Sequence, residues 1–184
     1  VCSEDLEDLL HTLLKRGKID SIHEYTPNLG FNPKVGGAIN EVHKNNMCLN
    51  ISRELGFEYF MLMACDEFYR KRDLDHMRYL MHHENYDSCF SFMYTYYKDS
   101  WTRFLEIENY YIPTIHKISD GVNFIRNYKS NLIDLGVDPC RSMPIEKPLI
   151  IPKQMPMMHH LSHVRKDFRK KLENSSAKPN FVGL

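Results

Sequence analysis

Apolar residues gather in one short run near the middle of the chain. The run extends from Phe57 to Cys65, follows Gly56 and ends at two carboxylates, Asp66 and Glu67. A run of this length fits a strand that is buried on both faces of a parallel sheet. Open α/β sheets bind their ligands at the carboxyl ends of such strands. We therefore expect a central strand with a ligand site at its end; the alternative is that the acids only end the strand and cap the next turn.

The segments before this run predict two helices and a strand. Residues 3–17 carry leucines at helical spacing, which form one apolar stripe, and Gly17 can end the helix. Residues 19–25 alternate apolar and polar side chains and predict a short strand. Residues 38–55 have helical spacing that a polar cluster at 44–46 interrupts.

The segments after the run predict further strands and helices. The expected elements are a short helix capped by Asp73, aromatic strands over 87–97 and 110–118, a helix over 122–135 and a final helix capped by Ser162. Residues 137–156 hold five of the nine prolines and should be mostly irregular.

Length and composition limit the architecture. With 184 residues, of which 42% are hydrophobic, residues 1–184 should form one domain with one core. A formal net charge of zero gives no strong field toward nucleic acid or an anionic membrane. The five cysteines are scattered without a Cys-x-x-Cys pair, which is typical of reduced thiols in the cytoplasm. A helix signal begins almost at Val1, so we expect an N-terminally incomplete domain.

Histidines and basic residues mark the last part of the chain. His159, His160 and His163 form its densest histidine cluster, and imidazole is a common metal ligand, although the spacing matches no closed zinc site. The basic helix expected after them could clamp a pyrophosphate. The alternatives are a surface or core run of histidines and a basic face that is only solvated.

Motifs of several common enzyme classes are absent from the sequence. It has no Gly-x-Gly-x-x-Gly, no P-loop and no Gly-x-Ser-x-Gly, so dinucleotide-binding, nucleoside-triphosphate and α/β-hydrolase folds receive little support. Several tyrosines can stack on a sugar or a base, or simply fill a sheet face. They are Tyr94, Tyr96, Tyr97, Tyr110 and Tyr111.

Two blocks of the chain together resemble family-two glycosyltransferases of the A-type fold, in a bacterial subgroup. The first block is Asp66-Glu-Phe-Tyr after the apolar run, and the second is His159-His-Leu-Ser-His-Val-Arg-Lys. The resemblance implies an α/β, Rossmann-like mixed sheet flanked by helices, here without its first strand. In that family the strand ends in Asp-x-Asp, and the first of these aspartates falls on Ala64.

The resemblance also implies a metal-assisted transfer of sugar from a nucleotide-sugar donor to a glycan or glycolipid acceptor. The implied metal ligands for Mn²⁺ or Mg²⁺ are Asp66 and one histidine, His160 or His159, with His163 as a further candidate. The residues implied to bind the donor diphosphate are Asp66, Glu67, Arg165 and Lys166. An inverting enzyme needs a carboxylate base near the acceptor hydroxyl. Glu106 and Glu108, in a polar loop, are the candidates.

Two other interpretations stay open. A catalytically degraded relative, acting as a carbohydrate-binding or scaffolding protein, would explain Ala64 and the missing strand. A nucleic-acid-binding module would rest on the basic final helix, but zero net charge argues against it. A glycolipid acceptor would also allow peripheral association with a membrane.

Overall fold

The computed structural model describes residues 4–30, 36–133, 136–155 and 157–164. Its helices are α1 (Glu4–Lys15), α2 (Gly36–Glu54) and α3 (Lys71–His83). Its strands are β1 (Tyr59–Met61), β2 (Glu67–Tyr69), β3 (Ser88–Ser91), β4 (Met93–Tyr97), β5 (Tyr110–Lys117), β6 (Gly136–Val137), β7 (Pro148–Ile150) and β8 (Met158–His163).

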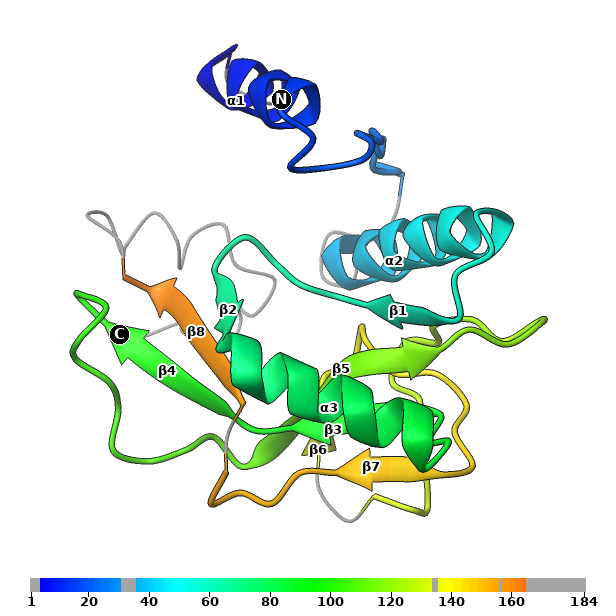
Figure 1. The fold of residues 1–184 in the computed structure, drawn as a ribbon, viewed down its shortest axis with the longest axis vertical. Helices are drawn as coiled ribbons and strands as arrows, with labels where there is room; N and C mark the ends of the chain where they lie inside the picture. The colour runs from blue at the N-terminus through cyan, green and yellow to red at the C-terminus, as the bar shows by residue number, and fades with distance from the viewer. Residues whose placement is uncertain (1–3, 31–35, 134–135, 156, 165–184) are drawn as a thin grey trace.

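These strands form two mixed sheets. The larger has the order β1-β5-β3-β7, with β6 also paired to β5, and the smaller has the order β2-β8-β4. The pairs β3–β7, β4–β8 and β5–β6 are parallel, and the other pairs are antiparallel. Figure 1 shows α3 across the larger sheet and α2 beside β1. The molecule is therefore of the α/β class, with mixed sheets flanked by helices, as the sequence predicts.

Two apolar clusters attach the helices to the larger sheet. On one face, Met77 and Met81 of α3 pack with Cys89, Ile115 and Leu149. Near α2, the second cluster is made by Val42 and Leu49 with Phe124, Cys140 and Met143. Burial of this apolar surface, and not local helix propensity, supplies most of the stability of such helices.

The expected central strand over 57–65 is wrong in position and extent. Of these residues only Tyr59–Met61 form a strand. Among the described strands it is an edge strand of the larger sheet, and it pairs antiparallel with β5. Its residues are half-buried, because α2 lies on one face, α3 lies partly on the other, and no described strand pairs with its outer edge. Phe57 and Met63, just outside β1, have 58% and 61% of their surface exposed.

The other element predictions divide into confirmed and wrong ones. α1, α2 and the aromatic strands β3, β4 and β5 are confirmed, and Gly17 has the left-handed φ of +61° that a helix stop requires. Residues 19–25 form no strand, and 122–133 form turns and irregular backbone in place of a helix. The described part of 137–156 is mostly irregular, as predicted, and β7 and the second residue of β6 are its regular elements.

Two predicted helix caps are also wrong. α3 begins at Lys71, so Asp73 lies inside its first turn, and the residue at the cap position, Arg70, makes no side-chain capping bond. Ser162 lies in β8 and is buried. The basic helix predicted after it, with Arg165 and Lys166, falls outside the described residues.

Candidate functional site

The pairing of β2 with β8 brings Asp66 and His160 together although 94 positions separate them in the sequence. Glu67 stands opposite His160 in the ladder, and the amide of Leu161 donates to the carbonyl oxygen of Asp66 over 2.8 Å. These bonds place His160 Nε2 3.9 Å from Asp66 Oδ1. A carboxylate oxygen and an imidazole nitrogen therefore lie close together where β2 begins.

Strand alternation places His159 and His160 on opposite faces of the smaller sheet. His159 stands opposite Phe68 and Tyr94, on the other face of the smaller sheet from His160. There its Nδ1 lies 2.7 Å from the hydroxyl oxygen of Tyr96. Burial, with the nearby charges of Arg70 and Arg103, lowers the pKa of His159. His159 thus faces away from His160, the histidine whose Nε2 lies 3.9 Å from Asp66 Oδ1.

His163 lies at the far end of β8. It is the ladder partner of Tyr97, and its ring meets the edge of Phe104 with centroids 6.2 Å apart. Of the three clustered histidines, the structure brings His160 to the carboxylate.

Glu67 was expected to bind the donor diphosphate, but its side chain is buried and paired with Arg141. Its carboxylate is 4% exposed and accepts two hydrogen bonds from Arg141, over 2.9 Å and 2.5 Å. It also accepts a hydrogen bond from the amide of Ala64 over 3.0 Å. The charge-assisted pair and the amide bond hold the turn that carries Asp66, so Glu67 supports this turn from inside the molecule.

Glu108 is linked by a hydrogen bond to the smaller sheet, through Thr95 of β4. Thr95 is the ladder partner of His160 on β4, and its hydroxyl donates to Glu108 Oε1 over 3.0 Å. Burial raises the pKa of Tyr110, and the charges of Glu108 and Asp138 act in the same direction. Glu106 lies exposed in the loop between β4 and β5. Of the two candidate bases, Glu108 is the one tied to the strand next to His160.

A hollow of about 270 Å³ lies between α2 and residues 62–64. Ala64, Lys44 and Arg141 are among its lining residues. Glu41 also lines it, and burial, followed by the charge of Asp138, raises the pKa of this carboxyl group. The hollow combines basic and carboxyl groups beside the turn that carries Asp66.

Arg141 and Asp138 are the site residues that sequence reasoning missed. Arg141 binds Glu67, and its Nε lies 3.5 Å from Asp138 Oδ2. Both belong to a proline-rich stretch without periodicity, so no pattern pointed to them. Their only signal is indirect: a buried acid such as Glu67, next to an apolar run, requires a cationic partner from elsewhere in the chain.

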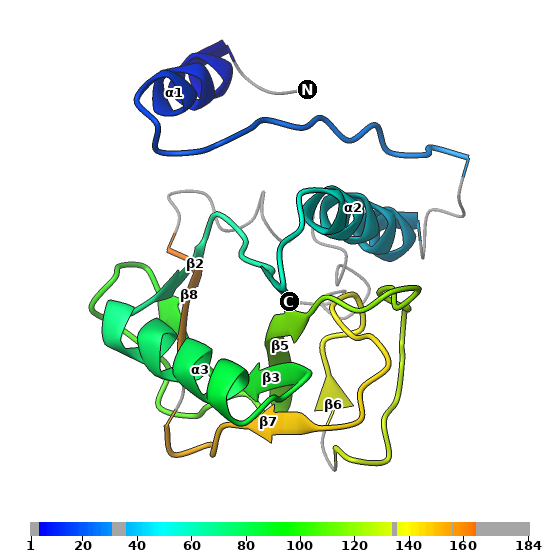
Figure 2. The same ribbon diagram turned by 45° about the vertical axis from the view of Figure 1, so that its right-hand side comes forward.

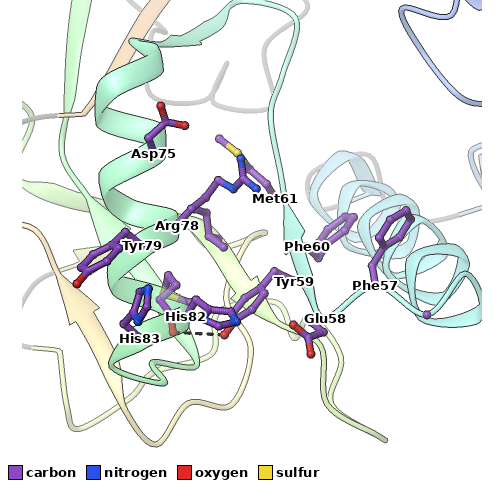
Figure 3. A pocket seen from close by; sticks show the side chains of 13 residues that line it. Phe57, Glu58, Tyr59, Phe60, Met61, Asp75, Arg78, Tyr79, His82 and His83 are labelled. Carbon is purple, nitrogen blue, oxygen red and sulfur yellow. Dashed lines mark hydrogen bonds between the residues drawn. The ribbon is translucent and has the colours of Figure 1, made fainter.

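A larger hollow, of about 750 Å³, lies away from this site, between α3 and β1 (Figure 3). Within the described residues, no group of three or more histidine, cysteine, aspartate or glutamate side chains is arranged to hold a metal ion. None of the described helices combines the length and the apolar character that crossing a bilayer demands.

Comparisons with known proteins found nothing to match this chain, neither among protein-family models nor among curated proteins or solved structures.

Proposed function

We propose that the protein is a glycosyltransferase that moves a sugar from a nucleotide-sugar donor to a glycan or glycolipid acceptor, assisted by a divalent cation. The observation that carries the proposal is the meeting of Asp66 and His160 at 3.9 Å. These residues belong to the two sequence blocks on which the resemblance to family-two glycosyltransferases rests. The A-type fold and the donor class are part of the same proposal.

Asp66 and His160 fit Mn²⁺ better than Mg²⁺, because Mg²⁺ takes oxygen ligands. One carboxylate oxygen and one imidazole nitrogen suit a Mn²⁺-like ion, which accepts both ligand types. When bound, the cation would neutralise charge on the donor diphosphate as it leaves. Two protein ligands are few, which is consistent with a site in which the donor diphosphate and water supply further oxygens.

The remaining residues of the site have roles that follow from their positions. Arg141 donates hydrogen bonds to Glu67, and Glu67 accepts a hydrogen bond from the backbone amide of Ala64. Together these bonds hold the turn that carries Asp66. Lys44, on the lining of the adjacent hollow, is a cation for a phosphate group. Glu108 is the candidate base that would take the acceptor proton.

A degraded relative that binds carbohydrate without transferring it is the second candidate. Two observations favour it: Ala64 stands where the resembled family has an aspartate, and the ion pair with Arg141 withdraws Glu67. Asp66 then supplies the single carboxylate of this motif for the cation, and affinity for hard cations depends on the number of such charges.

The test measures Mn²⁺-dependent binding of nucleotide-sugars by calorimetry, and nucleotide release with a panel of donors. Asp66→Asn and His160→Ala should each weaken Mn²⁺-dependent binding by about tenfold or more, since each removes a ligand. The double variant should lose less than the sum, because either change already breaks the shared site. His159→Gln, on the opposite face of β8, is the matched control and should bind like the parent.

Ala64→Asp extends this test in the other direction. An added carboxylate should tighten Mn²⁺ binding if residue 64 faces the cation. Nucleotide release would support the enzyme, whereas donor binding without release would favour the degraded relative. Equal Mn²⁺ binding by the parent, Asp66→Asn and His160→Ala would remove the metal-assisted proposal.

A further inference from the structure

The loop between β4 and β5, residues 98–109, exposes large apolar side chains to solvent. Trp101 and Leu105 have 91% and 98% of their surface exposed, and Phe104 has 47% exposed. These three side chains form the apolar tip of the loop. In both ribbon views the loop lies at the periphery of the molecule, beyond the end of β4 (Figures 1 and 2). Apolar side chains gathered on a surface in this way mark a site of interaction.

The backbone of this loop is hydrogen-bonded within the molecule. The amides of Trp101 and Thr102 donate to Asp99 Oδ1 over 2.9 Å and 2.6 Å. The amide of Tyr97 donates to the carbonyl of Thr102 over 2.9 Å, and the amide of Phe104 donates to a carbonyl of β4 over 2.9 Å. An amide that is bonded inside the molecule loses little when water leaves it. The loop can therefore enter a poorly hydrated layer without stranding these backbone groups.

The charged side chains around the tip balance each other. Lys98 and Arg103 lie over tyrosine rings of β4, with the Lys98 Nζ 5.4 Å and the Arg103 guanidinium 4.3 Å from the ring centroids. Hydrogen bonds from two backbone amides lower the pKa of Asp99, so this carboxylate stays charged. Glu106 is exposed directly after the tip. Two cations and two carboxylates leave residues 98–106 without net charge, so attraction to a surface has to come from the apolar side chains.

We propose that the apolar tip inserts into the headgroup layer of a lipid bilayer. The indole of Trp101 suits this layer, because it combines a large apolar face with one polar N–H group. The charged groups beside the tip stay hydrated at this depth, where only apolar side chains reach the acyl boundary. Internally bonded backbone, exposed apolar side chains and balanced charge together fit a bilayer surface.

The same side chains fit other partners less well. A sugar ring stacks on aromatic faces and bonds to polar groups, so Leu105, the most exposed of the three, would add little to sugar binding. Three large side chains offer about 500 Å² of contact area. A stable protein interface buries roughly 800 Å² on each partner. A fluid bilayer requires neither that area nor a shaped pocket.

This inference rests on the surface of the loop and is independent of the proposed function. Within that function it bears on the acceptor: Glu108, the candidate base, belongs to the same loop, so a bilayer at the tip favours a glycolipid over a soluble glycan. Failure of the vesicle test below would leave the glycosyltransferase proposal standing. Loss of nucleotide-sugar binding would likewise leave the vesicle test unaffected.

Trp101 is the only tryptophan of the chain, so its fluorescence reports on the tip directly. Vesicles of phosphatidylcholine should shift its emission to the blue, and phosphatidylcholine brominated near the top of the acyl chains should quench it. Leu105→Asp should weaken vesicle binding by about tenfold or more, because a charge replaces a large apolar side chain. Leu29→Asp is the matched control and should bind like the parent, since Leu29 is 91% exposed in another part of the chain.

Several outcomes would overturn the insertion. Emission that vesicles leave unchanged, or equal binding by Leu105→Asp and the parent, would show that the tip stays in water. A blue shift that follows protein concentration without lipid would indicate contact between two copies of the chain. A blue shift with maltoheptaose and none with vesicles would indicate a glycan site.

Sedimentation with vesicles gives a second measurement, which separates apolar insertion from charge attraction. Binding to pure phosphatidylcholine should persist at high salt, because the tip carries no net charge that salt could screen. Trp101→Ala should lower this binding by about tenfold or more. Binding only to vesicles that contain phosphatidylglycerol, and only at low salt, would assign the attraction to basic residues elsewhere and contradict the insertion.

Discussion

The buried pair of Glu67 and Arg141 is the residue-scale feature on which the candidate site depends. Their side chains are 4% and 11% exposed, and two hydrogen bonds join them. Removing one partner of a buried pair strands the other charge in a poorly solvated place. Because Glu67 also accepts the amide of Ala64, loss of Arg141 should disturb the turn that carries Asp66.

We therefore predict that Arg141→Met lowers the free energy of unfolding by about 3 kcal/mol or more. Chemical denaturation measures this change. The double variant Glu67→Gln/Arg141→Met should recover part of the loss, since no unpaired charge then stays buried. Lys71→Met breaks the exposed ion pair with Asp75 and is the control, with an expected change of about 0.5 kcal/mol or less. Equal effects of Arg141→Met and Lys71→Met would show that the buried pair has no special weight.

At the scale of elements, side-chain hydrogen bonds of two asparagines, in addition to apolar contacts, hold α2 against the rest of the molecule. Its polar cluster, which blurs the helical pattern in the sequence, contains Asn45 and Asn46. Asn45 is buried and donates to the carbonyl of Cys140 over 3.0 Å. Asn46 donates to the carbonyl of Phe124 over 3.0 Å and accepts from its amide over 2.7 Å. These bonds fix Phe124 and Cys140, which lie in irregular backbone before and after β6, against α2.

The corresponding prediction concerns Asn46→Ala. This change leaves the amide and the carbonyl of Phe124 without their partners, so it should cost about 1–3 kcal/mol of unfolding free energy. Thermal unfolding monitored by circular dichroism provides the measurement. Asn50→Ala, on the exposed side of the same helix, is the matched control and should change stability by less than about 1 kcal/mol. A loss at position 50 as large as at position 46 would refute the anchoring role.

At the scale of the whole molecule, the local sequence pattern predicted which segments form helices and strands better than it predicted how these elements pack against each other. Leucine spacing and Gly17 predict α1, and aromatic runs predict β3 to β5, because both signals are local. The position of β1 at a sheet edge is a matter of strand pairing, which its apolar run does not encode. His160 reaches Asp66 through the β2–β8 pairing, and this long-range contact was predicted from the resemblance alone. Arg141 lay in a segment without periodicity and was missed.

The stability of the whole molecule should also depend on pH through His116. This residue is fully buried in β5, between its ladder partners Phe60 on β1 and Ser88 on β3, and its Nδ1 lies 2.8 Å from the Ser88 hydroxyl oxygen. Burial lowers its pKa to about 3, and the charge of Arg141 acts in the same direction. In the unfolded chain the imidazole has an ordinary pKa of about 6.5.

The unfolded state therefore binds more protons than the folded state between these two pKa values. The contribution of His116 to stability is complete above pH 6.5 and falls as the pH drops toward 3, by up to about 1.4 kcal/mol per pH unit. From pH 7 to pH 5 the free energy of unfolding should fall by about 2 kcal/mol through this residue. Urea titrations across this range measure the slope. His116→Gln, which cannot be protonated there, should flatten it, whereas His76→Gln on the exposed side of α3 should not. An unchanged slope in His116→Gln would show that acid acts on the fold through other groups.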